Sequence, residues 1–206
     1  MVIYPLVEGD GEVQALPVLL RRLLSDASVY DVQIGRPLKL SGSQFFREDT
    51  VARYVRLACI KEGGCAAVLL LVDGEDICPA EWGPRIATWA HGAADGRPCR
   101  AAVAYREYES WFLAGLESLG GQCGLPDSLA EHPDPEGRRD AKGQLTALMP
   151  AGRAYRETSD QAALSARLDL AATYSRSRSF RHLVDTVGEL LRDLGRELAV
   201  WPPWPA

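Results

Sequence analysis

The sequence has no surplus of basic residues, no cysteine pair at metal-ligand spacing and no long apolar run. Its 206 residues carry a formal net charge of −5, which argues against a protein that coats nucleic acid by electrostatics alone. Five cysteines without a CxxC pair are typical of a reducing cytoplasm, and we expect them to be small core residues. The longest apolar run, residues 66–72, is far shorter than a membrane span.

Three further absences narrow the function classes. The start of the chain, MVIYPLVEGDG, has no basic stretch before its apolar residues, so we expect a cytoplasmic protein without a signal peptide and without a membrane partner. No GxxxxGK[ST] sequence occurs, which excludes a P-loop. The three histidines have no partner at ligand spacing, which argues against a zinc site or a Ser-His-Asp triad: His91, His132 and His182.

What is present is enough apolar material for one sizeable core. With 47% hydrophobic residues, a chain of this length buries most of its apolar surface without a staple. A metal site found in it would therefore serve function rather than stability. Short apolar runs alternate with stretches of helical period, which predicts an α/β fold, a mainly parallel sheet flanked by helices.

The expected elements divide the chain into two parts. Strands are predicted at 2–7, 66–72 and 100–105, with weaker strand material at 28–40, and helices at 13–24, 50–62, 83–93, 164–172 and 180–198. Pro17 means that the first helix begins late or kinks. We expect an α/β domain over 1–117, then a long loop over 120–143 within a C-terminal helical extension, 118–206, packed on the same core. The Trp-Pro tail, residues 201–206, either folds back on its own domain or docks on a partner.

Carboxylates follow three of the four predicted strands. Right-handed crossovers bring the carboxyl ends of parallel strands to one rim, where ligands bind. So many acids on one rim would repel one another unless a cation or a proton intervened. Oxygen ligands without His or Cys favour Mg²⁺ or Mn²⁺. The rim residues are Glu8 and Asp10, then Asp73, Glu75 and Asp76, then Glu107 and Glu109.

The charge is unevenly distributed. Residues 138–181 contain nine basic and four acidic groups, so the remainder of the chain stands at −10. From this segment Lys142, Arg176 and Arg178 are candidates to bind substrate phosphate. The alternative for the two arginines is a solvated region at a helix start. For Glu107 and Glu109 the alternative is likewise a solvated helix start, where the helix dipole favours acids.

Two motifs carry a resemblance to a known superfamily. A first strand that ends in Glu-Gly before a helix, and a hydrophobic strand that ends in Asp73-Gly74-Glu75-Asp76, resemble the Toprim domain of topoisomerases, primases and OLD-type nucleases, over residues 1–110. The segments VEGDGEVQALPVLLRRLL, EYESWFLA and SRSF also resemble an uncharacterised bacterial Toprim-like family, through residue 190.

The resemblance implies roles for individual residues. Glu8 matches the Toprim glutamate, a general acid/base and in some members a metal ligand, and Asp73 matches the first aspartate of the DxD motif, which binds Mg²⁺. Glu75 stands where the second aspartate is expected and Asp76 follows it, so either of them is the next ligand. Glu109, or alternatively Glu107, would complete a second metal position.

Three functions are compatible with these residues. The first is a Mg²⁺-dependent phosphotransfer enzyme, a Toprim-type nuclease acting on DNA or RNA; the resemblance implies phage defence beside a separate ABC-like or AAA-type ATPase. The second is a non-catalytic Toprim-fold binding or regulatory subunit, which the Glu75 departure favours. The third is a small-molecule phosphohydrolase, since a carboxylate rim with Mg²⁺ also suits nucleotides.

Overall fold

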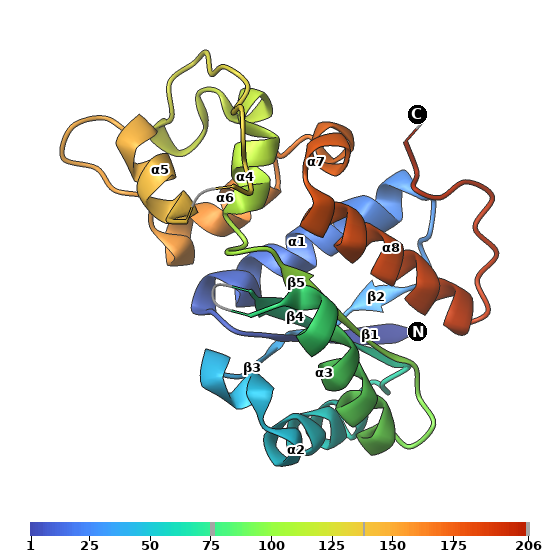
Figure 1. Cartoon of the computed structure of the whole chain (residues 1–206). Helices are drawn as coiled ribbons and strands as arrows, with labels where there is room; N and C mark the ends of the chain where they lie inside the picture. The colour runs from blue at the N-terminus through green and yellow to red at the C-terminus, as the bar shows by residue number, and fades with distance from the viewer. Residues whose placement is uncertain (75–76, 138, 205–206) are drawn as a thin grey trace.

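A parallel β-sheet forms the centre of the molecule. The structure, a computed structural model, describes residues 1–74, 77–137 and 139–204. Five strands pair in parallel in the order β2-β1-β4-β5, with β3 also on β1 (Figure 1). This confirms the predicted α/β fold with a mainly parallel sheet. The strands are β1 (Val2–Val7), β2 (Gln33–Ile34), β3 (Leu38–Lys39), β4 (Ala67–Asp73) and β5 (Cys99–Ala104).

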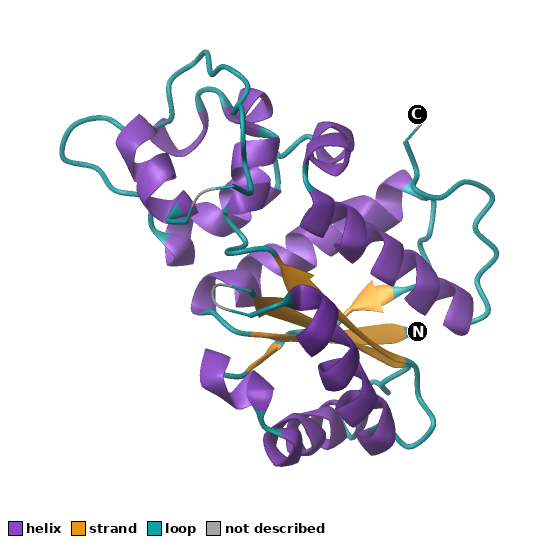
Figure 2. Ribbon diagram, in the orientation of Figure 1, coloured by secondary structure: helices purple, strands orange, loops and turns teal. Residues whose placement is uncertain are grey.

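Helices cover both faces of the sheet, because strand side chains alternate between two buried layers (Figure 2). Ile3 and Leu69 face the layer that contains α1 (Asp10–Asp26) and α8 (Arg178–Asp193). Tyr4 and Val68 face the layer of α2 (Glu48–Cys59) and α3 (Pro79–Ala93). The apolar run of β4 is thus explained by burial on both sides. The layer that contains α1 and α8 is built from residues of both 1–117 and 118–206.

Several predicted helix boundaries differ from the structure. α1 starts at Asp10 and continues through Pro17, so it does not begin late. The prediction of one helix over 164–172 is wrong, because the segment belongs to two helices, α6 (Ala162–Ser165) and α7 (Leu170–Arg176). The Asp169 carboxylate accepts the Ala172 N–H at 2.9 Å and so caps the start of α7. α8 stops at Asp193 rather than at residue 198, because Gly195 adopts φ 75° and closes the helix.

The segment between β5 and α8 is more helical than expected. α5 (Ala141–Leu148) lies partly inside the predicted loop. α4, α5 and α6 gather beyond the carboxyl ends of the strands (Figure 1). None of the helices in the described residues has both the length and the apolar character needed to cross a membrane. The shorter helical elements are η1 (Gly42–Phe46), α4 (Ser110–Ala114), η2 (Leu116–Leu119), η3 (Gln122–Gly124) and η4 (Glu157–Gln161).

The described part of the Trp-Pro tail, residues 201–204, folds back onto the domain. Trp201 packs on Gly188 of α8, where an added Cβ would lie 2.3 Å from the indole nitrogen, and it donates to the Val184 carbonyl at 3.2 Å. Trp204 donates to Asp26 at the end of α1 at 3.0 Å. The tail therefore covers one end of the layer formed by α1 and α8.

Glu136 ties the long loop to the start of α8. Its carboxylate accepts the N–H groups of Arg178 at 3.0 Å and Ser179 at 2.9 Å, and the Ser177 hydroxyl at 2.6 Å. The first N–H groups of a helix have no partner within the helix, so an acceptor there satisfies groups that would otherwise be left unpaired. This contact fixes the loop that leads into α5.

We predict that Glu136→Ala lowers the free energy of unfolding by about 2 kcal/mol, because charge-assisted hydrogen bonds to the helix start are lost. Urea unfolding followed by circular dichroism measures the change. The control is Glu131→Ala, which removes an exposed carboxylate paired with Arg176 at 2.9 Å and is expected to cost less than about 1 kcal/mol. Equal losses in the two variants would contradict this role of Glu136.

Candidate functional site

The ends of three strands bring the candidate acids to one rim. Leu6 of β1 pairs with Leu70 of β4, so the β1 and β4 strands end side by side. Glu8 follows β1 and Asp73 ends β4, opposite Ala104 of β5. The backbone N–H of Tyr108, just beyond β5, donates to Asp73 Oδ1 at 3.1 Å. Sheet register therefore places Asp73 between the two neighbouring strand ends.

The turn after β1 holds Glu8 against η1. An added Cβ on Gly42 would lie 2.1 Å from Glu8 Oε1, so the glutamate side chain packs directly on this glycine. The Glu12 carboxylate, buried in the first turn of α1, accepts the N–H groups of Glu8 at 2.9 Å and Gly9 at 3.0 Å. These bonds stabilise the tight turn and the helix start. Glu12 therefore fixes the backbone from which Glu8 projects.

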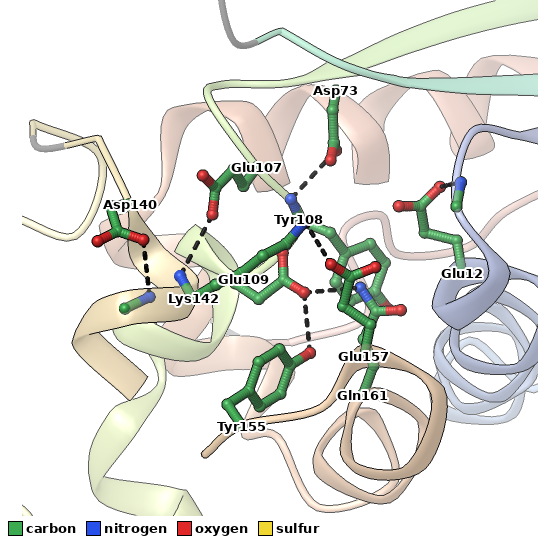
Figure 3. Close-up of polar contacts among 12 residues, drawn as sticks. Glu12, Asp73, Glu107, Tyr108, Glu109, Asp140, Lys142, Tyr155, Glu157 and Gln161 are labelled. Carbon is green, nitrogen blue, oxygen red and sulfur yellow. Dashed lines mark hydrogen bonds and ion pairs between the residues drawn. The ribbon is translucent and has the colours of Figure 1, made fainter. Parts of the chain in front are cut away.

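Glu109 is fully enclosed rather than solvated. Its side chain is 0% exposed, so the expectation of a solvated helix start is wrong for this residue. Oε1 accepts the Tyr155 hydroxyl at 2.8 Å and the Gln161 amide at 3.2 Å (Figure 3). Within the described residues Oε2 is buried without a hydrogen-bond partner, and so is Gln161 Oε1. Buried polar atoms left in this way are costly, so a proton, a water molecule or a ligand is expected to complete their hydrogen bonds.

Lys142 projects from α5 into the group of acids. Its ammonium lies 2.7 Å from Glu157 Oε1, and its backbone N–H donates to Glu107 Oε2 at 3.3 Å. Figure 3 shows the lysine side chain reaching between Glu109, Glu157 and Asp73. The predicted phosphate-binding lysine is thus part of the same cluster as the strand-end carboxylates. We call Glu8, Glu12, Asp73, Glu109, Glu157 and Lys142 the rim cluster.

Burial and mutual repulsion raise the pKa values of three acids in the rim cluster. Burial, and then the negative charges of Glu12, Glu109 and Glu8, raise the pKa of Asp73 well above its ordinary value. Burial also raises the pKa of Glu109 to about 7, against the lowering effect of Lys142. Burial likewise raises the pKa of Glu12. At neutral pH the cluster favours an additional proton or cation.

The single lysine offsets part of this repulsion. Burial alone would lower the pKa of Lys142, but the nearby charges of Glu109, Glu157 and Asp73 outweigh it and the net pKa is raised. Lys142 is therefore a permanent cation at neutral pH. One positive charge faces several carboxylates, so the cluster retains a negative potential.

Other candidate residues are placed elsewhere or lie outside the described residues. Glu75 and Asp76 fall in the gap after residue 74, and no group of three or more described His, Cys, Asp or Glu side chains lies close enough to hold a metal ion. Asp10 is exposed and pairs with Lys39 at 2.6 Å.

The two candidate arginines have contacts of their own. Arg176 donates to the carbonyls of Ala114 and His132 and pairs with Glu131. Arg178 is exposed next to Glu136. None of the hydrogen bonds and ion pairs identified among the described residues joins either arginine to the rim cluster. This placement fits the alternative of a solvated helix start for Arg178, the first residue of α8, but not for Arg176, which ends α7 and has a side chain only 18% exposed.

Two acids of the rim cluster, and the two residues that hold Glu109, were not predicted from the sequence. Glu12 had a signal, since an acid three residues after Gly9 in a first helical turn caps the helix. Glu157, Tyr155 and Gln161 had none, because they reach the rim only through the folding of the segment after α5.

We predict that stability falls as pH rises, because Glu109 has a higher pKa in the folded chain than in the unfolded one. Its contribution is fully present below the unfolded value, about 4.3, and is lost as pH rises through about 7, on the order of 3 kcal/mol. Urea unfolding at pH 5 and pH 8 measures this difference. The difference in unfolding free energy between pH 5 and pH 8 is expected to shrink in Glu109→Gln and to stay unchanged in the exposed control Glu117→Gln. An unchanged pH dependence in Glu109→Gln would contradict the assignment.

Comparison with known proteins gives a family and no activity. A family model described as "Domain of unknown function (DUF4276)" matches residues 7–188. No curated protein and no solved structure matches the chain. The matched region runs from the end of β1 into α8 and so contains the whole rim cluster. The chain belongs to this family, the domain of unknown function DUF4276.

Proposed function

We propose that this chain is a Mg²⁺-dependent phosphotransfer enzyme of the Toprim-type nuclease class, which hydrolyses phosphodiester bonds in DNA or RNA. One observation carries the proposal: Asp73 ends the central strand beside the end of β1, and burial together with Glu12, Glu109 and Glu8 raises its pKa well above the ordinary value. A carboxylate in this position gains most from a bound divalent cation.

The donor set suits a hard cation. All candidate ligands are carboxylate oxygens, which favour Mg²⁺ or Mn²⁺. Glu8 and Asp73 would hold the ion, with Glu75 or Asp76, which follow Asp73 in the sequence, as the next ligand. Glu109 supports a second position through its unpartnered buried Oε2. When bound, the ion neutralises charge on the phosphate and activates a water molecule.

The protein's own residues supply the remaining steps. Lys142 carries the positive charge of the rim cluster and would attract a phosphate oxygen, while Glu157 lies 2.7 Å from its ammonium. Glu8, held by the turn that Glu12 stabilises, is the candidate to accept a proton from the attacking water. Tyr155 and Gln161 hold Glu109 in place. A separate ABC-like or AAA-type ATPase is the partner that the Toprim resemblance suggests.

One observation favours a second candidate, a non-catalytic binding or regulatory subunit. The Lys142 ammonium already reaches among the acids (Figure 3). An internal lysine can balance buried carboxylates without any metal, as a fixed counter-charge. In that case the rim cluster would serve to join α5 and η4 to the sheet.

Cleavage assays separate the two candidates. With labelled single- and double-stranded nucleic acid and Mn²⁺, we expect the wild type to cleave, and Asp73→Asn to lose at least about 100-fold in rate. The control Asp10→Asn changes an acid close to Glu8 in the sequence that lies outside the rim cluster, exposed and paired with Lys39, and it is expected to keep activity. Cleavage by Asp73→Asn at the wild-type rate would contradict the proposal, and its absence in the wild type favours the binding subunit.

Lys142 has its own test. We predict that Lys142→Met reduces kcat/KM for cleavage by roughly 100-fold, because a charge that stabilises the reacting phosphate is removed. Lys39→Met, which removes an exposed lysine from the same edge, serves as the control and is expected to retain activity. Steady-state kinetics at saturating Mn²⁺ measure both. Equal activity of the two variants would show that Lys142 has only a structural role.

A further inference from the structure

A row of aromatic rings lies on α3 and η1. Phe46 packs edge-on against Trp82 with ring centroids 4.8 Å apart, and Trp82 meets Trp89 at 6.3 Å. The Arg85 guanidinium lies over both indoles, 4.4 Å from the Trp82 ring and 5.5 Å from the Trp89 ring. We call Phe46, Trp82, Arg85 and Trp89 the aromatic row. It belongs to the sheet face covered by α2 and α3, opposite α1 and α8 (Figure 1).

The aromatic row lies partly buried at the surface of α3 and η1. All three aromatic side chains are only partly buried, and the Arg85 side chain is 51% exposed. Trp82, Arg85 and Trp89 recur at spacings of three and four, so they share one face of α3. Arg85 also lies 3.6 Å from Glu81, in an exposed pair that holds it weakly. The guanidinium is thus oriented mainly by the two indoles.

The row continues directly from the rim cluster. Gly42, the first residue of η1, packs on the Glu8 carboxylate, and Phe46, the last residue of η1, packs on Trp82. α3 itself begins at Pro79, six residues after Asp73. η1 therefore connects the candidate catalytic acid to the first indole through direct contacts.

We propose that the aromatic row binds the unpaired bases of a single-stranded nucleic acid whose backbone leads to the rim cluster. The half-exposed guanidinium of Arg85, held over two partly exposed indoles, offers a flat surface on which bases of any sequence stack, and it adds a phosphate contact. The net charge of −5 leaves electrostatic attraction weak, so stacking must supply much of the affinity. Paired bases are stacked within the duplex and cannot use the row. This proposal rests on the proposed function, whose substrate class it specifies.

Binding can be measured apart from catalysis. Fluorescence anisotropy with a labelled deoxythymidine oligonucleotide, and with a duplex of equal length, is recorded in EDTA so that metal-dependent cleavage cannot occur. We expect the wild type to prefer the single strand. Trp82→Ala is expected to weaken single-strand binding roughly tenfold, and Trp82→Phe to retain most of it. Tyr30→Ala, which removes an aromatic that is 77% exposed outside the row, is the control and leaves binding unchanged.

A second variant protects the test from misfolding. Arg85→Gln alters a half-exposed side chain and is expected to weaken binding several-fold, with a smaller effect at high salt. Three results would overturn the proposal. They are wild-type binding to neither oligonucleotide, wild-type binding to the duplex that is as tight as binding to the single strand, and full binding by both Trp82→Ala and Arg85→Gln. The first result would leave the row to a protein partner. If binding depends on the aromatic row but the protein does not cleave in Mn²⁺, the binding role of the row stands and the nuclease proposal fails. If the protein cleaves but binding does not depend on the row, the nuclease proposal stands and the binding role fails.

Discussion

Repulsion between carboxylates around the end of β4 is the constraint on which the arrangement of this molecule depends. Asp73 ends the central strand, and the charges of Glu8, Glu12 and Glu109 act on it from three other segments. Only Lys142 in the rim cluster opposes them. Acids placed in this way destabilise a fold unless protons, cations or a ligand compensate. Their collection at one rim therefore suggests function rather than stability.

The C-terminal segment supplies several residues at that rim. α5 delivers Lys142, and η4 and the chain before it deliver Glu157, Tyr155 and Gln161. Glu136 fixes the loop before α5 by binding the start of α8. α8 in turn packs on β5 and on the same core layer as α1. Two basic residues of this segment thus have defined places, Arg176 in contacts that hold the fold and Lys142 in the rim cluster.

The sequence allowed the sheet to be predicted, and it indicated four residues of the rim cluster as candidates: Glu8, Asp73, Glu109 and Lys142. Continuous apolar runs reveal buried strands because both faces of β4 are covered, and the parallel order then brings Glu8 and Asp73 to one edge. The enclosure of Glu109 could not be predicted, because it depends on Tyr155 and Gln161, about fifty residues away. The start of α7 depends on Asp169 and the end of α8 on Gly195, and an apolar stripe reveals neither.

The central claim is that the carboxylates around Asp73 bind a divalent cation. Titration of the purified protein with Mn²⁺, followed by the electron paramagnetic resonance signal of the free ion, tests it most directly. The account predicts that wild-type protein removes Mn²⁺ from solution, that Mg²⁺ competes, and that Asp73→Asn loses this binding while Asp10→Asn keeps it. A signal that the wild type leaves unchanged, at protein concentrations in excess of the ion, would contradict the account.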